Sequence, residues 1–103
     1  MQATLHRAAS GHLTISFNDS PPSFWREVSD RLIKEHGFTR LGPEVAGLDE
    51  EIHRDFVSPA CALAAGRDNW SGYYLLSGSE AGDNFLTSLY AQIQPPSRPA
   101  PNL

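Results

Sequence analysis

The fold is decided by residues 51–77, EIHRDFVSPACALAAGRDNWSGYYLLS. This stretch contains three short segments, which are Glu51–Val57, Ala60–Ala65 and Tyr73–Ser77. The residues between them are rich in serine, proline, glycine, aspartate and asparagine, which favour turns. Short apolar segments separated in this way are typical of antiparallel strands joined in sequence order. We therefore predict a three-stranded meander.

The residues at the start of this meander also have a helical interpretation. The large apolar side chains between residues 44 and 57 would cluster on one face of a helix. Asp49 and Asp55 would interrupt that face, and Gly47 would lie inside the helix. We favour a strand at Glu51–Val57, and a helix over residues 44–57 remains the alternative.

A further strand is predicted upstream, at Gly11–Phe17. Leu13, Ile15 and Phe17 alternate there with polar residues, which indicates a strand with one buried face. A second alternating set, in the meander, is expected to form a smooth sheet face on which a helix lies. This set consists of Ala60, Ala62 and Ala64.

The first of two predicted helices is Phe24–His36. Its apolar residues occupy one half of a helical wheel and its charged residues the other half. Ser20 and Ser23 are the candidate N-caps. Gly37 follows at the position where a glycine commonly ends a helix.

The second predicted helix is Glu80–Ile93, which ends before Pro95. Ser79 is its expected N-cap. Gly82 lies on its apolar face, which indicates close contact with the structure beneath.

These elements predict an α+β domain with the order β-α-β-β-β-α. A small antiparallel sheet of about four strands would pack with the two amphipathic helices. The 103 residues suffice for one hydrophobic core, which we assign to residues 1–94. Four of the eight prolines lie in residues 95–103, so we expect a disordered, partly polyproline-like tail there.

Composition and charge exclude several classes of protein. The net charge of −4 argues against nucleic-acid binding through neutralised phosphates. Residues 1–20 lack the apolar run of a signal peptide, and no window is apolar enough for a membrane span. Cys61 is the single cysteine, so an intrachain disulfide is impossible. We expect a cytoplasmic protein without membrane association.

Charge is distributed unevenly along the chain. Residues 1–40 carry a net charge of +1, whereas residues 41–94 carry −6. Asp49, Glu50 and Glu51 are the densest acidic group, and they are candidates for attracting a basic protein partner. The alternative is a solvated edge strand whose charges prevent aggregation.

The loop between the last two predicted strands is the second candidate binding region. It contains Asp68, Asn69 and Trp70, and Tyr73 begins the next strand. Exposed aromatic residues in loops are enriched at binding hot spots. Trp70 would instead be structural if it folds back over the edge of the sheet.

Catalytic and metal-binding patterns are absent from the sequence. No cysteine or histidine spacing matches a metal site, so we predict neither metal nor cofactor. Cys61 lies in a predicted buried strand, where a nucleophilic role is disfavoured. We therefore expect a protein that is not an enzyme.

One set of short motifs resembles known sequences. It comprises VAGLDE at residues 45–50, Phe56, the D-x-W-S-G-Y run at residues 68–73 and EAGD at residues 80–83. The chain resembles, over residues 45–90, small uncharacterised bacterial proteins of the domain-of-unknown-function type. This resemblance implies a strand-loop-strand arrangement around Trp70 and no particular activity.

The favoured hypothesis is a non-enzymatic bacterial domain that binds another protein, as an immunity protein or antitoxin that masks a basic partner. The alternative is a small-ligand or enzyme domain with a cleft between sheet and helix. Its polar lining would be Tyr73, Tyr74, His53 and Asp55. A homodimer formed through an exposed strand edge is a third possibility.

Overall fold

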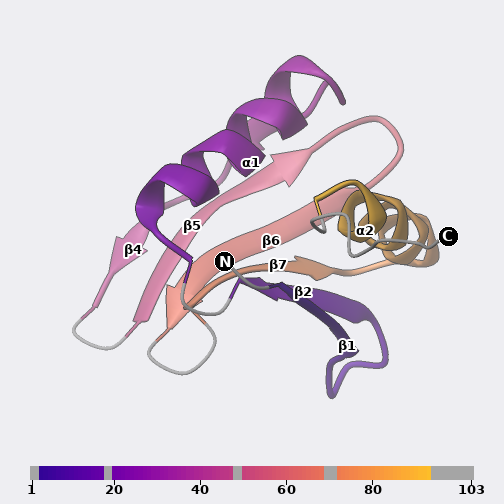
Figure 1. Ribbon diagram of the computed structural model, residues 1–103, viewed down its shortest axis with the longest axis horizontal. Coiled ribbons are helices and arrows are strands. Elements are labelled where there is room, and N and C mark those ends of the chain that lie inside the picture. The colour runs from indigo at the N-terminus through magenta and orange to yellow at the C-terminus, as the bar shows by residue number, and fades with distance from the viewer. Residues whose placement is uncertain (1–2, 18–19, 48–49, 69–71, 94–103) are drawn as a thin grey trace, which may run out of the picture.

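The computed structural model describes residues 3–17, 20–47, 50–68 and 72–93. Within them a seven-stranded antiparallel sheet packs with two helices, in strand order β1-β2-β7-β6-β5-β3 (Figure 1). The short strand β4 pairs with the first half of β5, and β3 pairs with its second half. The strands are β1 (Thr4–Arg7), β2 (Leu13–Phe17), β3 (Thr39–Leu41), β4 (Val45–Ala46), β5 (Glu50–Val57), β6 (Ala62–Asp68) and β7 (Gly72–Ser77). The helices are α1 (Pro22–Lys34) and α2 (Glu80–Ile93).

The α+β class agrees with the prediction, but the predicted sheet of about four strands in the order β-α-β-β-β-α is wrong. The three additional strands, β1, β3 and β4, have four, three and two residues. Strands this short hold too few residues for an alternating pattern to emerge. They also lie at the sheet margins, where side chains remain mostly exposed. The strand predicted at Gly11–Phe17 is β2, which forms a hairpin with β1, and Gly11 has φ +93° in the turn between them.

Residues 50–57 form a strand, so the helical alternative is wrong there. A β-bulge between His53 and Phe56 shifts the register of β5 against β6. The rings of His53 and Phe56 both lie near the Trp25 ring of α1, at centroid distances of 5.8 and 6.3 Å. The two residues therefore share one face of the sheet although they are three positions apart in the strand. An extra residue in the strand explains why the alternation in this segment is imperfect.

The prediction that Ala60, Ala62 and Ala64 lie beneath a helix is also wrong. The core side of β6 contains the buried side chains of Leu63 and Ala65, whereas Ala62 is exposed. Because side chains alternate between faces, Ala62 and Ala64 lie on the side of the sheet away from Leu63. Burial of one leucine outweighs the smooth surface that the alanines offer.

Helix α1 begins without a side-chain cap. Pro21 occupies its N-cap position, so neither Ser20 nor Ser23 has the predicted role. The proline ring restricts φ to a value suited to helix entry. Helix α1 ends at Lys34, two residues before the predicted His36. The role predicted for Gly37 is confirmed, because Gly37 has φ +73° and the Phe38 N–H donates to the Leu32 carbonyl at 3.0 Å.

Helix α2 has the bounds that the sequence predicts. The Gly82 N–H donates to the Ser79 hydroxyl at 3.1 Å, which confirms the cap. A Cβ on Gly82 would clash with the hydroxyl of Ser77, so the close approach is confirmed as well. At the same end, Asp83 accepts a hydrogen bond from the Leu13 N–H at 2.8 Å and anchors α2 to β2.

Both helices contribute to a single core on one side of the sheet. Trp25 of α1 packs edge-on against Phe17, and α2 packs against β1, β2 and β7. The largest fully buried side chains are Phe17, Phe56, Ile15, Leu32, Leu63, Leu75, Leu86 and Leu89. Neither helix in the described ranges has the length and apolarity that crossing a membrane requires.

Candidate functional site

The side of the sheet opposite the core is covered by neither of the two described helices. We call this surface the open face and define it by Val45, Ile52, Ala64, Gly66, Tyr74 and Leu76. The strand register aligns Val45, Ile52, Gly66 and Tyr74 in one row across β4, β5, β6 and β7. Ala64 and Leu76 form the neighbouring row.

The apolar residues at one end of the open face are unusually exposed. Val45 is 53% exposed and Ile52 is 46% exposed, and the two are directly paired between β4 and β5. Large apolar side chains that adjoin one another at the surface mark interaction sites more often than scattered ones do. The pair therefore provides the apolar part of a candidate binding surface.

Tyr74 lies across the middle of the open face. A Cβ at Gly66 would lie 2.6 Å from the Tyr74 hydroxyl and 2.8 Å from Cζ, so the phenol covers the glycine. An aromatic residue over a cross-strand glycine is a known way to stabilise a sheet. Burial raises the pKa of Tyr74, and the charges of Glu50 and Asp68 raise it further. The phenol is therefore neutral at physiological pH.

Glu50 and Asp68 form the acidic border of the open face. They are paired directly across β5 and β6, two residues along from the pair Ile52 and Gly66. Negative potential thus adjoins the apolar row.

Glu51 lies on the core side, although the sequence groups it with Glu50. Its carboxylate pairs with Arg67 at 3.0 Å and with His53 at 3.1 Å. These hydrogen bonds, that of Arg67 first, lower the pKa of Glu51 and keep it ionised. Because its charge is already compensated, Glu51 contributes little to the acidic surface.

Tyr73 also lies on the core side, where its ring stacks on Trp25 with centroids 5.0 Å apart and an interplanar angle of 9°. Of the seven predicted partner-binding residues, the structure therefore brings Glu50 and Asp68 together on the open face. It places Glu51 and Tyr73 on the other side of the sheet. The other three, Asp49, Asn69 and Trp70, lie outside the described residues.

The four residues of the alternative ligand site do not converge. His53 and Tyr73 share the aromatic cluster at Trp25, with centroids 6.0 Å apart. Tyr74 lies on the open face, and Asp55 is exposed in the bulged part of β5 opposite Leu41.

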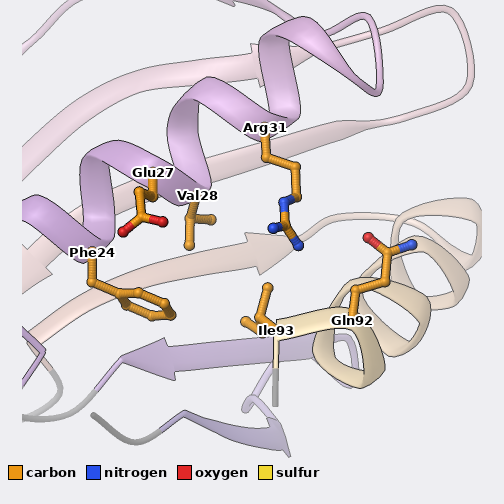
Figure 2. A pocket seen from close by; sticks show the side chains of 6 residues that line it. All are labelled: Phe24, Glu27, Val28, Arg31, Gln92 and Ile93. Carbon is orange, nitrogen blue, oxygen red and sulfur yellow. The ribbon is translucent and has the colours of Figure 1, made fainter. Parts of the chain in front are cut away.

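A pocket of about 120 Å³ does lie between the two helices (Figure 2). In Figure 2 Phe24 and Val28 of α1 face Ile93 of α2, and Arg31 approaches Gln92. Pockets that hold drug-sized ligands usually span roughly 300–1,000 Å³. This pocket has room for a small fragment and does not include any of the four expected residues.

Metal-binding and nucleophilic groups have no favourable arrangement in the described part of the chain. It holds no group of three or more histidine, cysteine, aspartate or glutamate side chains that could hold a metal ion. Cys61 is partly buried, and this burial raises the pKa of its thiol. A raised pKa keeps the sulfur protonated and weakly nucleophilic at neutral pH.

Three residues of the open face, Val45, Ile52 and Gly66, were not expected from the sequence to be binding candidates. Tyr74 was expected only in the lining of a ligand cleft. A signal was available, because Val45 and Ile52 flank the acidic run and a glycine inside a strand often marks close approach by another group. These residues share one face of the sheet only because of how the strands pair, and the sequence does not define that pairing.

Comparisons with protein-family models, curated proteins and solved structures give no significant match to this chain. The resemblance to small bacterial proteins therefore stays a prediction.

Proposed function

We propose that this chain is a non-enzymatic domain that binds another protein through the open face. The observation that carries the proposal is the exposed apolar pair Val45 and Ile52, which continues into Tyr74 on the side not covered by the described helices. Burial of such a surface by a partner removes apolar area from water, which drives most protein association.

A basic partner fits the charge of this surface. Residues 41–94 carry a net charge of −6, and Glu50 and Asp68 border the open face. Opposite charge on a partner would accelerate association and select against acidic competitors. These features support a role in the cytoplasm as an immunity protein or antitoxin that masks a basic protein.

The test compares two isoleucines that are similarly exposed on different sides of the molecule. Ile52, on the open face, is 46% exposed, and Ile33, on α1, is 41% exposed. The tagged chain and its Ile52→Asp and Ile33→Asp variants would be used to capture proteins from an extract of the source organism. Circular dichroism would first verify that both variants are folded.

The proposal predicts one partner, bound stoichiometrically by the parent chain and by Ile33→Asp. Ile52→Asp should retain less than a tenth of it, since a charge buried at an apolar contact is strongly unfavourable. Equal retention by the two variants, or no stoichiometric partner at all, would contradict the proposal.

A further inference from the structure

We propose that β1 pairs antiparallel with β1 of a second copy of this chain, which joins the two sheets edge to edge. The edge of the sheet is a different surface from the open face, so this inference goes beyond the proposed function. It is carried by the backbone geometry of the hairpin β1–β2 and by the contrast between the two margins of the sheet.

The two margins of the described sheet differ in how well they could accept a further strand. β1 forms one margin (Figure 1) and keeps a single register with β2 over Thr4–Arg7, which contains neither glycine nor proline. At the other margin, β3 and β4 have three and two residues, and Gly42, at φ +98°, and Pro43 separate them. Proline and backbone irregularity at an edge hinder strand addition. Of these two margins, β1 is therefore the one suited to pairing.

The hydrogen bonds of the hairpin define which backbone groups of β1 point away from β2. The Ala8 N–H donates to the His12 carbonyl at 2.8 Å, and these two residues continue the register of β1 with β2. Bonded and non-bonded pairs alternate along an antiparallel ladder. His6 therefore bonds to β2, whereas the N–H and C=O groups of Leu5 and Arg7 point outward.

These outward groups are self-complementary. When two copies meet antiparallel with His6 on the two-fold axis, Leu5 of each copy lies opposite Arg7 of the other. Each such pair exchanges both of its backbone hydrogen bonds, so every outward group of Leu5 and Arg7 finds a partner. Directly opposed side chains lie on one face of the sheet, so the aliphatic part of Arg7 covers the half-buried Leu5 of the other copy.

The same symmetry limits the assembly to two copies. The contact is closed, because it uses β1 of both copies and leaves the margins of β3 and β4 outermost. The two-fold axis is perpendicular to the sheet, so both open faces lie on one side of the dimer. A ladder of four residues buries less than the roughly 1,200 Å² of stable complexes, so we expect a dissociation constant on the order of 0.1 mM.

Sedimentation equilibrium from about 10 µM to about 1 mM would measure the mass of the full chain, which is 11.3 kDa for one copy. Arg7→Pro removes an outward N–H at a position of an edge strand where proline is tolerated. Arg7→Ala is the matched control, because it also removes the side chain and its hydrogen bond to the Gly11 carbonyl but keeps the N–H. Circular dichroism would verify that both variants are folded.

We expect the mass of the parent chain to approach twice that of one copy at the highest concentration. Arg7→Pro should weaken the association by about tenfold or more, because each copy loses a hydrogen-bond donor, and Arg7→Ala by no more than about threefold. A parent chain that stays at 11.3 kDa, masses above that of a dimer, or equal association by the two variants would overturn the inference.

Amide hydrogen exchange of the unmodified chain is a second measurement that needs no variant. In dilute solution the Leu5 and Arg7 amides should exchange rapidly and the His6 amide slowly, and at about 1 mM the first two should become about fivefold slower. Protection of Leu5 and Arg7 at every concentration would show that the edge is already covered within one copy. That result, or no protection at about 1 mM, would refute the pairing.

The variant Ile52→Asp separates this inference from the proposed function. It should leave the β1 dimer intact, because Ile52 lies on β5, while it abolishes capture of the partner. A dimer that Ile52→Asp converts to a monomer would instead place the second copy on the open face and overturn the edge pairing.

Discussion

Replacement of Gly66 by alanine tests how closely the neighbouring strands β5 and β7 pack around this glycine of β6. The new methyl group would lie 2.5 Å from the Glu51 carbonyl oxygen and 2.6 Å from the Tyr74 hydroxyl. Ordinary contact begins near 3.4 Å, so the backbone oxygen would have to recede by about 0.9 Å. The phenol can rotate away, but the carbonyl is part of the sheet and moves only with the backbone of β5.

Two opposing effects determine how much Gly66→Ala changes the free energy of unfolding. Overpacking typically costs about 1–3 kcal/mol, whereas replacing a glycine within a strand recovers about 0.5–1 kcal/mol of conformational entropy. Overpacking outweighs the gain here because one of the two clashes is with the backbone. We expect a loss of about 1–2 kcal/mol in the free energy of unfolding, or roughly 5–15 °C in Tm for a domain of this size.

Urea and thermal unfolding, followed by circular dichroism, would measure the change. Gly78→Ala is the matched control, because no heavy atom lies within 4 Å of a Cβ built at Gly78. This control should be neutral or stabilising by about 0.4–1 kcal/mol. If Gly66→Ala proved as stable as the parent chain, the close approach of the Glu51 carbonyl to Gly66 would be wrong.

Three further predictions concern the packing of α2 and the core. Ser79→Ala removes the cap and should cost about 1 kcal/mol in urea unfolding, whereas Ser79→Asp should retain most of the stability. Leu63→Ala empties a fully buried position and should cost about 2–5 kcal/mol; a loss below 1 kcal/mol would show that Leu63 is not in the core. The hydrogen bond from the Leu13 N–H, followed by that from His12, lowers the pKa of Asp83 to about 2 from 3.8. Its stabilising contribution is therefore complete above about pH 4 and is lost as pH falls towards 2, so Asp83→Asn should flatten the stability profile in that window and an unchanged profile would refute the assignment.

Local features of the helices could be predicted from the sequence. The bounds of α2, the cap by Ser79 and the close approach at Gly82 all depend on residues near one another in the chain. Gly37 was identifiable for the same reason, since a glycine after an amphipathic run commonly adopts positive φ.

Features that depend on pairing between distant segments could not be predicted. The two-residue strand β4 exists because Val45 and Ala46 pair with β5, and its own composition carries no strand signal. The bulge after His53 changes which residues of β5 face the core, and alternation alone cannot locate it.

The candidate site was harder to predict from the sequence than any helix, because its composition depends on strand pairing. Glu50 and Glu51 are adjacent acids in the sequence, but a strand directs them to opposite faces. One borders the open face, and the other is paired with Arg67 and His53. A local count of charge therefore overstated the acidic surface and missed the apolar row beside it.

Methyl cross-saturation on the complex with the captured partner would show whether the partner contacts the open face. The chain has four isoleucines, at 15, 33, 52 and 93, which report on the core, the outer side of α1, the open face and the pocket between the helices. If the partner binds the open face, irradiation of the partner should saturate the methyl group of Ile52 and leave those of Ile33 and Ile93 unchanged. Saturation of Ile33 or Ile93 with an unaffected Ile52 would place the partner on the helices and contradict binding through the open face.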